Sequence, residues 1–232
     1  MSGRTFKALL LDIEGTTTPI SFVTDVLFPY AQAQYADYIN RNWNDKSFSS
    51  YKEAFASEDK SLVADPETLI AFVLKKHASN EKHTAFKSLQ GALWKSGYED
   101  GSIKSIVYPD VPRKIQALSD SEIGTYIYSS GSIPAQKLLF KYSDQGDLTP
   151  SLRGYYDTST AGAKTAASSY TKINESVNLK TGDWLFLSDN VNEVRAAQEA
   201  GMQSYVVSRP GNAELNAEER QTFKVIESFD EI

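Results

Sequence analysis

Four short apolar segments, each followed at once by small or acidic polar residues, constrain the fold of this chain more than any other feature. They span residues 6–11, 124–128, 184–187 and 204–207. Runs of this length that end in turn-forming residues are typical of buried strands in a parallel sheet, because such strands are covered on both faces. The sequence therefore predicts four parallel strands.

Helical patterns separate these segments. Three helices are expected, at residues 110–118, 134–142 and 193–200. Asp110 is expected to cap the first helix, and Gly201 to end the third in a left-handed conformation. The alternation predicts an α/β fold in which helices cover both faces of an open sheet. Ligands bind at the carboxyl ends of such strands, so Asp12, residues 129–132 and Asp189 are expected to converge on one crevice.

One long stretch, residues 20–106, interrupts this alternation. It lacks clear strands and repeats its apolar residues at helical spacing. Asp65 followed by Pro66 is typical of a helix start within it. The stretch is interpreted as a helical lobe inserted after the first strand, and residues 1–19 and 107–232 are predicted to form the α/β core.

Composition excludes several classes of function. The net charge is −6, from 24 basic and 30 acidic residues, and no basic cluster is present, which argues against binding to nucleic acid or anionic membranes. The absence of cysteine and the presence of two histidines, His77 and His83, exclude disulfides, thiolate zinc sites and multi-histidine metal centres. The longest apolar run, residues 69–74, is far shorter than the ~20 residues of a membrane helix. We expect no signal peptide and a cytoplasmic location, with a nuclear presence left open.

Acidic residues follow two of the predicted strands. Asp12 and Glu14 suit the binding of a divalent metal beside a phosphate, and a carboxylate near a phosphoryl group can also act as a nucleophile. Asp189 could complete the metal's ligand set, while Asn190 and Glu193 could hold metal-bound waters. Alternatively, these residues only form polar turns and cap the next helix. The residue types alone leave both interpretations open.

Two further polar clusters lie at the expected crevice. Ser129 and Ser130 precede a predicted helix, whose N-terminus could bind an anion, although capping by Ser132 explains the same pattern without a ligand. Lys164 follows a stretch of small residues and could neutralise a phosphate as a point charge. Considered alone, a lysine is more often a solvated surface residue.

The order of these clusters resembles the four motifs of the haloacid dehalogenase superfamily of phosphotransferases, in which a helical cap is often inserted after the first motif. The resemblance extends to the enolase-phosphatases of methionine salvage. It is carried by residues 11–23, 27–30, 89–91, Trp94, 97–98, 128–132, 135–140 and 209–213, and so spans nearly the whole chain. Its most distinctive feature is Glu14, where most phosphatases of the superfamily have a second aspartate. Two stretches depart from the family pattern: Ala163 replaces a bulkier polar residue, and residues 45–61 resemble nothing familiar.

The resemblance implies a Mg²⁺-dependent phosphatase with a haloacid dehalogenase-like core and an inserted helical cap. The enzyme would enolise 2,3-diketo-5-methylthiopentyl-1-phosphate and then release phosphate to give the acireductone 1,2-dihydroxy-3-keto-5-methylthiopentene. One Mg²⁺ per chain is expected, held by Asp12, Glu14 and Asp189. The partner is a small phosphate ester, and the chain is expected to be a monomer. No residue is assigned as the base for enolisation.

The same resemblance implies a role for each site residue. Asp12 would attack phosphorus, and Glu14 would handle the proton of the leaving group. Ser129 and Ser130 would bind phosphate or substrate oxygens. Lys164 would act both in catalysis and in substrate binding by offsetting negative charge on the transferred group.

Four other classes of protein fit parts of the pattern. A phosphatase for another small ester fits all the core motifs but not those of the lobe. A metal-free dehalogenase would leave Glu14 and Asp189 without a purpose. A receiver domain has its phosphorylated aspartate on a later strand and lacks an inserted lobe. A non-catalytic binding protein descended from a phosphatase would be expected to lose Asp12 or Lys164.

Overall fold

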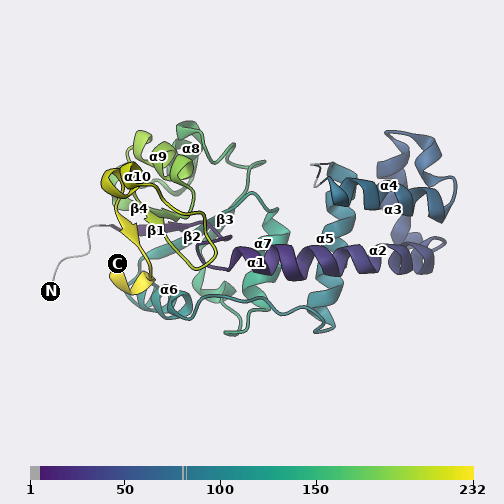
Figure 1. Cartoon of the computed structure of the whole chain (residues 1–232), viewed down its shortest axis with the longest axis horizontal. Coiled ribbons are helices and arrows are strands. Elements are labelled where there is room, and N and C mark those ends of the chain that lie inside the picture. The colour runs from purple at the N-terminus through teal and green to yellow at the C-terminus, as the bar shows by residue number, and fades with distance from the viewer. Residues whose placement is uncertain (1–5, 80, 82) are drawn as a thin grey trace. The chain divides into compact units, whose positions relative to one another are not determined.

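The computed structural model describes residues 6–79, 81 and 83–232. Their strands form one six-stranded parallel sheet (Figure 1). The strand order is β3-β2-β1-β4-β5-β6, with every neighbouring pair parallel. The strands are β1 Ala8–Leu11, β2 Gly124–Tyr128, β3 Gly154–Tyr156, β4 Trp184–Ser188, β5 Gln203–Val207 and β6 Val225–Ile226. The structure confirms the predicted α/β fold and all four predicted strands.

The first strand, β1, lies at the centre of the sheet because all of its residues are apolar and can be buried on both faces. Ala8 pairs with Gly124 of β2 on one side and with Trp184 of β4 on the other. All four residues of β1 are buried. The chain therefore leaves the middle of the sheet at Asp12, between the ends of β2 and β4.

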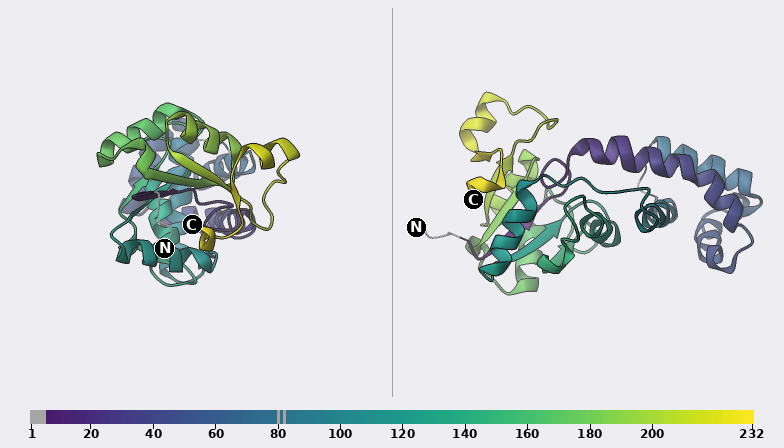
Figure 2. Two further views of the ribbon diagram at one scale, coloured as in Figure 1. Left: turned by 90° about the vertical axis from the view of Figure 1, so that its left-hand side faces the viewer. Right: turned by 90° about the horizontal axis from the view of Figure 1, so that it is seen from below.

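Helices cover both faces of the sheet, as predicted (Figures 1 and 2). Those of this part of the chain are α1 Ile20–Phe22, α6 Asp110–Asp120, α7 Ile133–Lys141, α8 Ala167–Val177, α9 Val191–Glu199 and α10 Ala217–Thr222. Helices α8 and α9 lie over one face, where Tyr170, Ile173 and Ala197 join a buried cluster with Ala8 and Leu10. Helices α6 and α7 lie on the opposite face. Short 3₁₀ turns are formed by Thr149–Ser151, Thr181–Asp183 and Phe229–Glu231.

Two predicted helix ends have different outcomes. Gly201 follows α9 with φ +88°, which confirms the left-handed termination. The prediction that Asp110 caps α6 is wrong, because Asp110 is the first residue of that helix and its side chain makes no cap hydrogen bond. Its carboxylate instead accepts a hydrogen bond of 2.7 Å from the Arg209 guanidinium. This charged donor takes the place of the backbone N–H groups that a capping side chain would bind.

The chain divides into two compact units: residues up to 23 together with 104–232, and residues 24–103. The sequence predicts these divisions at 19/20 and 106/107. The π-helical turn Val23–Leu27 leads into the second unit. That unit contains α2 Phe28–Asn42, α3 Ser49–Ala56, α4 Pro66–Ala78 and α5 Thr84–Glu99, with 3₁₀ turns at Lys46–Phe48 and Lys60–Val63.

The helical unit has its own apolar core, rich in aromatic side chains. Tyr35, Phe48, Phe55 and Phe86 are buried together in it. Two of these rings, Phe48 and Phe55, come from the polar stretch 45–61, whose structural role the sequence did not indicate. Asp65 accepts a hydrogen bond from the backbone N–H of Thr68 at the start of α4, as predicted. Within the described ranges, no helix is both long and apolar enough to cross a bilayer.

Candidate functional site

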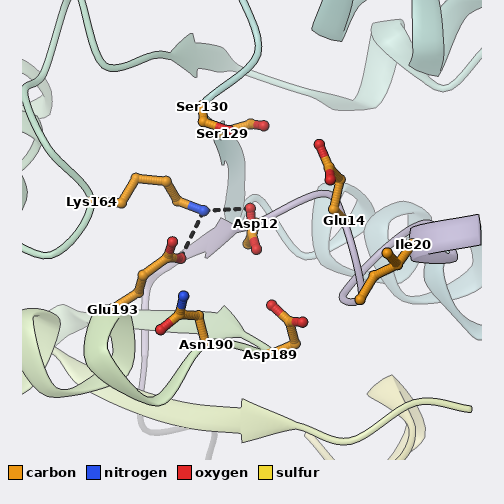
Figure 3. Close-up of a pocket in the computed structure, with 9 residues that line it drawn as sticks. All are labelled: Asp12, Glu14, Ile20, Ser129, Ser130, Lys164, Asp189, Asn190 and Glu193. Atoms are coloured by element: carbon orange, nitrogen blue, oxygen red, sulfur yellow. Dashed lines mark hydrogen bonds and ion pairs between the residues drawn. The ribbon is translucent and has the colours of Figure 1, made fainter. Parts of the chain in front are cut away.

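A pocket opens at the carboxyl ends of β1, β2 and β4, where the sequence predicts a crevice. It is lined by Asp12, Glu14, Ile20, Ser129, Ser130, Lys164, Asp189, Asn190 and Glu193 (Figure 3). The structure thus brings together the six residues that the sequence analysis proposes for catalysis, substrate binding and metal binding. They come from four separate loops because each loop follows a different strand or precedes a different helix.

Lys164 lies at the centre of the polar network. Its Nζ is 2.5 Å from Oδ1 of Asp12 and 2.7 Å from Oε2 of Glu193, and the residue is only 8% exposed. Its backbone carbonyl accepts a hydrogen bond of 2.6 Å from the Tyr170 hydroxyl. Burial opposes the positive charge, but the two carboxylates outweigh it and raise the lysine's pKa. Lys164 is therefore a charged, buried residue and not the solvated lysine of the alternative interpretation.

The network extends through a serine at the end of β4. The Ser188 hydroxyl lies 2.8 Å from Oε2 of Glu193 and 3.3 Å from Oδ2 of Asp12, so its single proton can be donated to either carboxylate. It also accepts a hydrogen bond from the Asn190 backbone N–H at 3.1 Å. Ser188 is fully buried and bridges the two carboxylates that contact Lys164.

Negative charge exceeds positive charge among the pocket's side chains. Burial is the main cause that raises the pKa of Glu14, Asp189 and Glu193, and the neighbouring Asp12 carboxylate raises each further. For Asp189 the pKa reaches about 7. The pocket thus contains four carboxylates and one lysine, which pairs with two of them, and this excess of acidic groups favours a bound cation.

The loop after β1 is a tight turn closed on itself and attached to the end of β4. The backbone N–H groups of Thr16, Thr17 and Thr18 all point to the carbonyl of Ile13, at 2.9–3.2 Å. Thr16 Oγ1 accepts a hydrogen bond of 3.0 Å from the backbone N–H of Asp189. This loop therefore fixes Asp12 and Glu14 relative to Asp189.

Gly15 is required at the tip of this turn. Its φ is +70°, and a Cβ at this position would lie 2.4 Å from Oδ2 of Asp189. Only glycine meets both conditions without strain. The close approach of Asp189 to the loop thus depends on this residue.

The loop after β2 is held by two residues that come later in the sequence, Gln136 and Asp157. Asp157 Oδ2 accepts a hydrogen bond from the backbone N–H of Ile133 at 3.2 Å. Gln136 Nε2 donates to the carbonyls of Gly131 and Tyr156, at 2.7 and 2.9 Å. Ser132 makes no side-chain cap, so capping by that serine, the alternative explanation of the pattern, is wrong. Asp157 binds the first N–H of α7 in its place, and Ser129 and Ser130 face the pocket (Figure 3).

Comparison with known proteins assigns the family. A model of the haloacid dehalogenase-like hydrolases matches residues 6–201. The chain belongs to the haloacid dehalogenase-like hydrolase family. It is 45% identical to the enolase-phosphatase E1 of Botryotinia fuckeliana, over 97% of this chain and 93% of that protein. It is 47% identical to the enolase-phosphatase E1 of Podospora anserina, over 97% of each. These similarities confirm the resemblance that the motifs indicate.

Solved structures of other haloacid dehalogenase-like proteins share the fold. The UTR4 protein of Saccharomyces cerevisiae matches with a TM-score of 0.87 and 36% identity, over 98% of this chain and all of that one. CbbY of Rhodobacter sphaeroides matches with a TM-score of 0.58 and 17% identity, over 97% and 96% of the two chains. The second similarity shows the common fold alone.

The donor set of the pocket fits the Mg²⁺ that haloacid dehalogenase-like phosphatases generally use. Mg²⁺ is usually held by one or two carboxylates, with waters and substrate phosphate as the other ligands. Asp12 and Asp189 can supply such carboxylates, and Glu14 lines the same pocket (Figure 3). Among the residues that the structure describes, no group of three His, Cys, Asp or Glu side chains is placed to hold a metal alone. The pocket therefore fits an open site that substrate completes.

Two predicted water-holding residues have other partners. The Asn190 side chain accepts a hydrogen bond of 3.0 Å from the backbone N–H of Asn192, which confirms the capping interpretation for that residue. Glu193 is paired with Lys164. No role was predicted from the sequence for Ser188, Thr16 or Asp157, whose partners lie in other loops and helices. The available signal was that these polar residues lie at or shortly after strand ends.

Proposed function

We propose that this chain is an enolase-phosphatase of methionine salvage, which enolises 2,3-diketo-5-methylthiopentyl-1-phosphate and then removes its phosphate. The observation that carries the proposal is the 45–47% identity to enolase-phosphatases E1 over 97% of the chain. The pocket supports the same chemistry, because it combines a buried aspartate, a buried lysine and further carboxylates at the ends of parallel strands.

We assign the attack on phosphorus to Asp12. A carboxylate oxygen of Asp12 forms a bond to phosphorus while the bond from phosphorus to the ester oxygen breaks, which leaves an aspartyl-phosphate and an enol. Glu14 gives a proton to the departing oxygen and takes one from the water that later hydrolyses the aspartyl-phosphate. Burial raises the pKa of Glu14, which suits a group that must hold a proton near neutral pH.

The other pocket residues prepare this reaction. Lys164 fixes one oxygen of Asp12 and offsets negative charge on the phosphoryl group. Ser129 and Ser130 bind phosphate or substrate oxygens through their hydroxyls. One Mg²⁺ would be held by the carboxylates of Asp12 and Asp189, with Glu14 contributing to the metal site, and would supply the positive charge that lets two anions approach each other.

The proposal extends to the setting of the enzyme. The helical unit, residues 24–103, is assigned as the inserted cap of the fold. We assign a monomer, because Ile106 is the one large apolar residue exposed in the described ranges. A cytoplasmic location and a lack of nucleic-acid binding accord with the net charge of −6. Light scattering of the purified chain tests the monomer, and cell fractionation tests the location.

The direct test is phosphate release from the diketo phosphate with Mg²⁺ and with a chelator. The wild type should release phosphate only with the metal, and Asp12→Asn should lose at least about 1,000-fold in rate, since removal of a nucleophile is among the largest single losses. Asp37→Asn, the same change at an exposed site in α2, serves as the control and should retain full activity. Release from simple esters but not from the diketone would keep the phosphatase and reject the substrate. Release that persists in Asp12→Asn would reject the assigned nucleophile.

A further inference from the structure

A segment after β5 reaches back to the loop that carries Asp12 and Glu14. Asn212 Nδ2 lies 2.8 Å from the carbonyl of Gly15 and 3.2 Å from the carbonyl of Val207. Both partners are acceptors, so the amide nitrogen, and not the oxygen, must face them. Asn212 therefore ties the tip of the first loop to the end of β5 through two donated hydrogen bonds.

The other end of the same amide faces the tip of the loop. Asn212 Oδ1 is buried and has no hydrogen-bond partner among the described residues. It lies 2.9 Å from the point that a Cβ of Gly15 would occupy, and Oδ2 of Asp189 lies 2.4 Å from the same point. The Asn212 amide oxygen and the Asp189 carboxylate thus both face the side of Gly15 on which a Cβ would project.

This segment is firmly anchored to the core at its other end. Arg209 is buried and donates to Oδ2 of Asp110 at 2.7 Å and to the carbonyl of Glu227 at 2.8 Å. Its guanidinium also lies 4.4 Å from the ring centre of Tyr108 and 3.4 Å, through Nε, from the carbonyl of Thr16. Because Arg209 fixes this segment to the core, Asn212 can hold the loop at Gly15 in a defined position.

We propose that Asn212 is a positioning residue of the active site, which sets the distance between the Asp12–Glu14 loop and Asp189. This inference rests on the proposed function, in which Asp12 and Asp189 would hold Mg²⁺. Thr16 already joins the two through the Asp189 backbone. Arg209 and the backbone N–H of Tyr108 hold the loop at the carbonyls of Thr16 and Thr17, and Asn212 adds the attachment at Gly15, beside Asp189.

The test uses Asn212→Ala and Asn212→Leu in the full chain. Leucine has the same branching and number of side-chain heavy atoms as asparagine but donates no hydrogen bond, so it separates loss of the side chain from loss of its hydrogen bonds. Mg²⁺ affinity is measured by calorimetry on metal-free protein, and kcat/KM is measured on the diketo phosphate. Both variants should bind Mg²⁺ about tenfold or more weakly than the wild type, as is usual when a residue behind a metal ligand is lost. Glu214→Gln, at an exposed position of the same segment, should leave both quantities unchanged.

Three results would overturn the inference. The first is wild-type Mg²⁺ affinity and kcat/KM in both variants. The second is a loss in Asn212→Ala that Asn212→Leu restores, because this would reduce the residue to a space-filling role. The third is a lower Tm without any change in Mg²⁺ affinity. If the wild type hydrolyses no phosphate ester, the proposed function fails, and the calorimetric comparison still decides the role of Asn212.

Discussion

Replacement of Lys164 by methionine tests whether this lysine balances the charge of the pocket. Methionine is an unbranched side chain of comparable length without the charge, so Lys164→Met leaves Asp12 and Glu193 buried and without their cation. Removing one partner of a buried ion pair costs about 3–5 kcal/mol. For a chain of this size, 1 kcal/mol corresponds to about 2–4 °C in Tm. The expected fall in Tm is therefore between about 6 and 20 °C in metal-free buffer.

The assay is thermal unfolding of the wild type and Lys164→Met, with a chelator and with saturating Mg²⁺. The fall should be smaller with Mg²⁺, because a cation bound by Asp12 replaces part of the missing charge. Lys172→Met, the same change on the exposed side of α8, controls for the loss of a lysine and should stay within about 0.5 kcal/mol of the wild type. A Tm of Lys164→Met equal to that of the wild type in chelator would refute the assignment of Lys164 as the balancing charge.

Two further changes test the loop after β1 and the anchor behind it. Gly15→Ala should lower Tm by about 2–8 °C, because a left-handed residue other than glycine costs about 1–2 kcal/mol, and should slow phosphate release at least about tenfold, because its Cβ displaces Asp189. Gly146→Ala, at φ +91° with open space around the Cβ position, has the same kind of backbone strain without a steric clash. Equal phosphate release by the two variants would contradict the displacement of Asp189 by the new Cβ. Burial acts to raise the pKa of Asp110, but hydrogen bonds from Arg209 and the Phe229 N–H outweigh it and lower that pKa. The carboxylate therefore stabilises the fold above the unfolded pKa of about 3.9, and this contribution is lost as the pH falls through the folded value. Unfolding of wild type and Asp110→Asn across pH should show a gap of about 3–5 kcal/mol at pH 7 that narrows below about pH 4, whereas a constant gap would contradict the ionic role.

The strands that shape the pocket could be predicted from sequence because each is long enough to show its burial. β1 and β4 are apolar throughout, apart from the final serine of β4, and end in acidic or small residues. β3 and β6 were not predicted. They lie at the two edges of the sheet and have only three and two residues, too few for a hydrophobic pattern to emerge.

The candidate site was predictable as a set of strand ends but not as a network. Asp12 and Asp189 stand out because carboxylates directly after buried strands need a reason. The pairing of Glu193 with Lys164, and of Asp110 with Arg209, joins residues 29 and 99 positions apart. Such contacts depend on which strands become neighbours, and this is a property of the folded sheet that local spacing does not contain.

The central claim is that one enzyme couples enolisation to phosphate removal. The measurement that tests it most directly follows acireductone absorbance and inorganic phosphate in the same reaction of the diketo phosphate with Mg²⁺ and wild-type protein. The account predicts one acireductone for each phosphate released, and neither product with Asp12→Asn. Phosphate released without the acireductone would contradict the account, because it would leave a phosphatase that does not enolise its substrate.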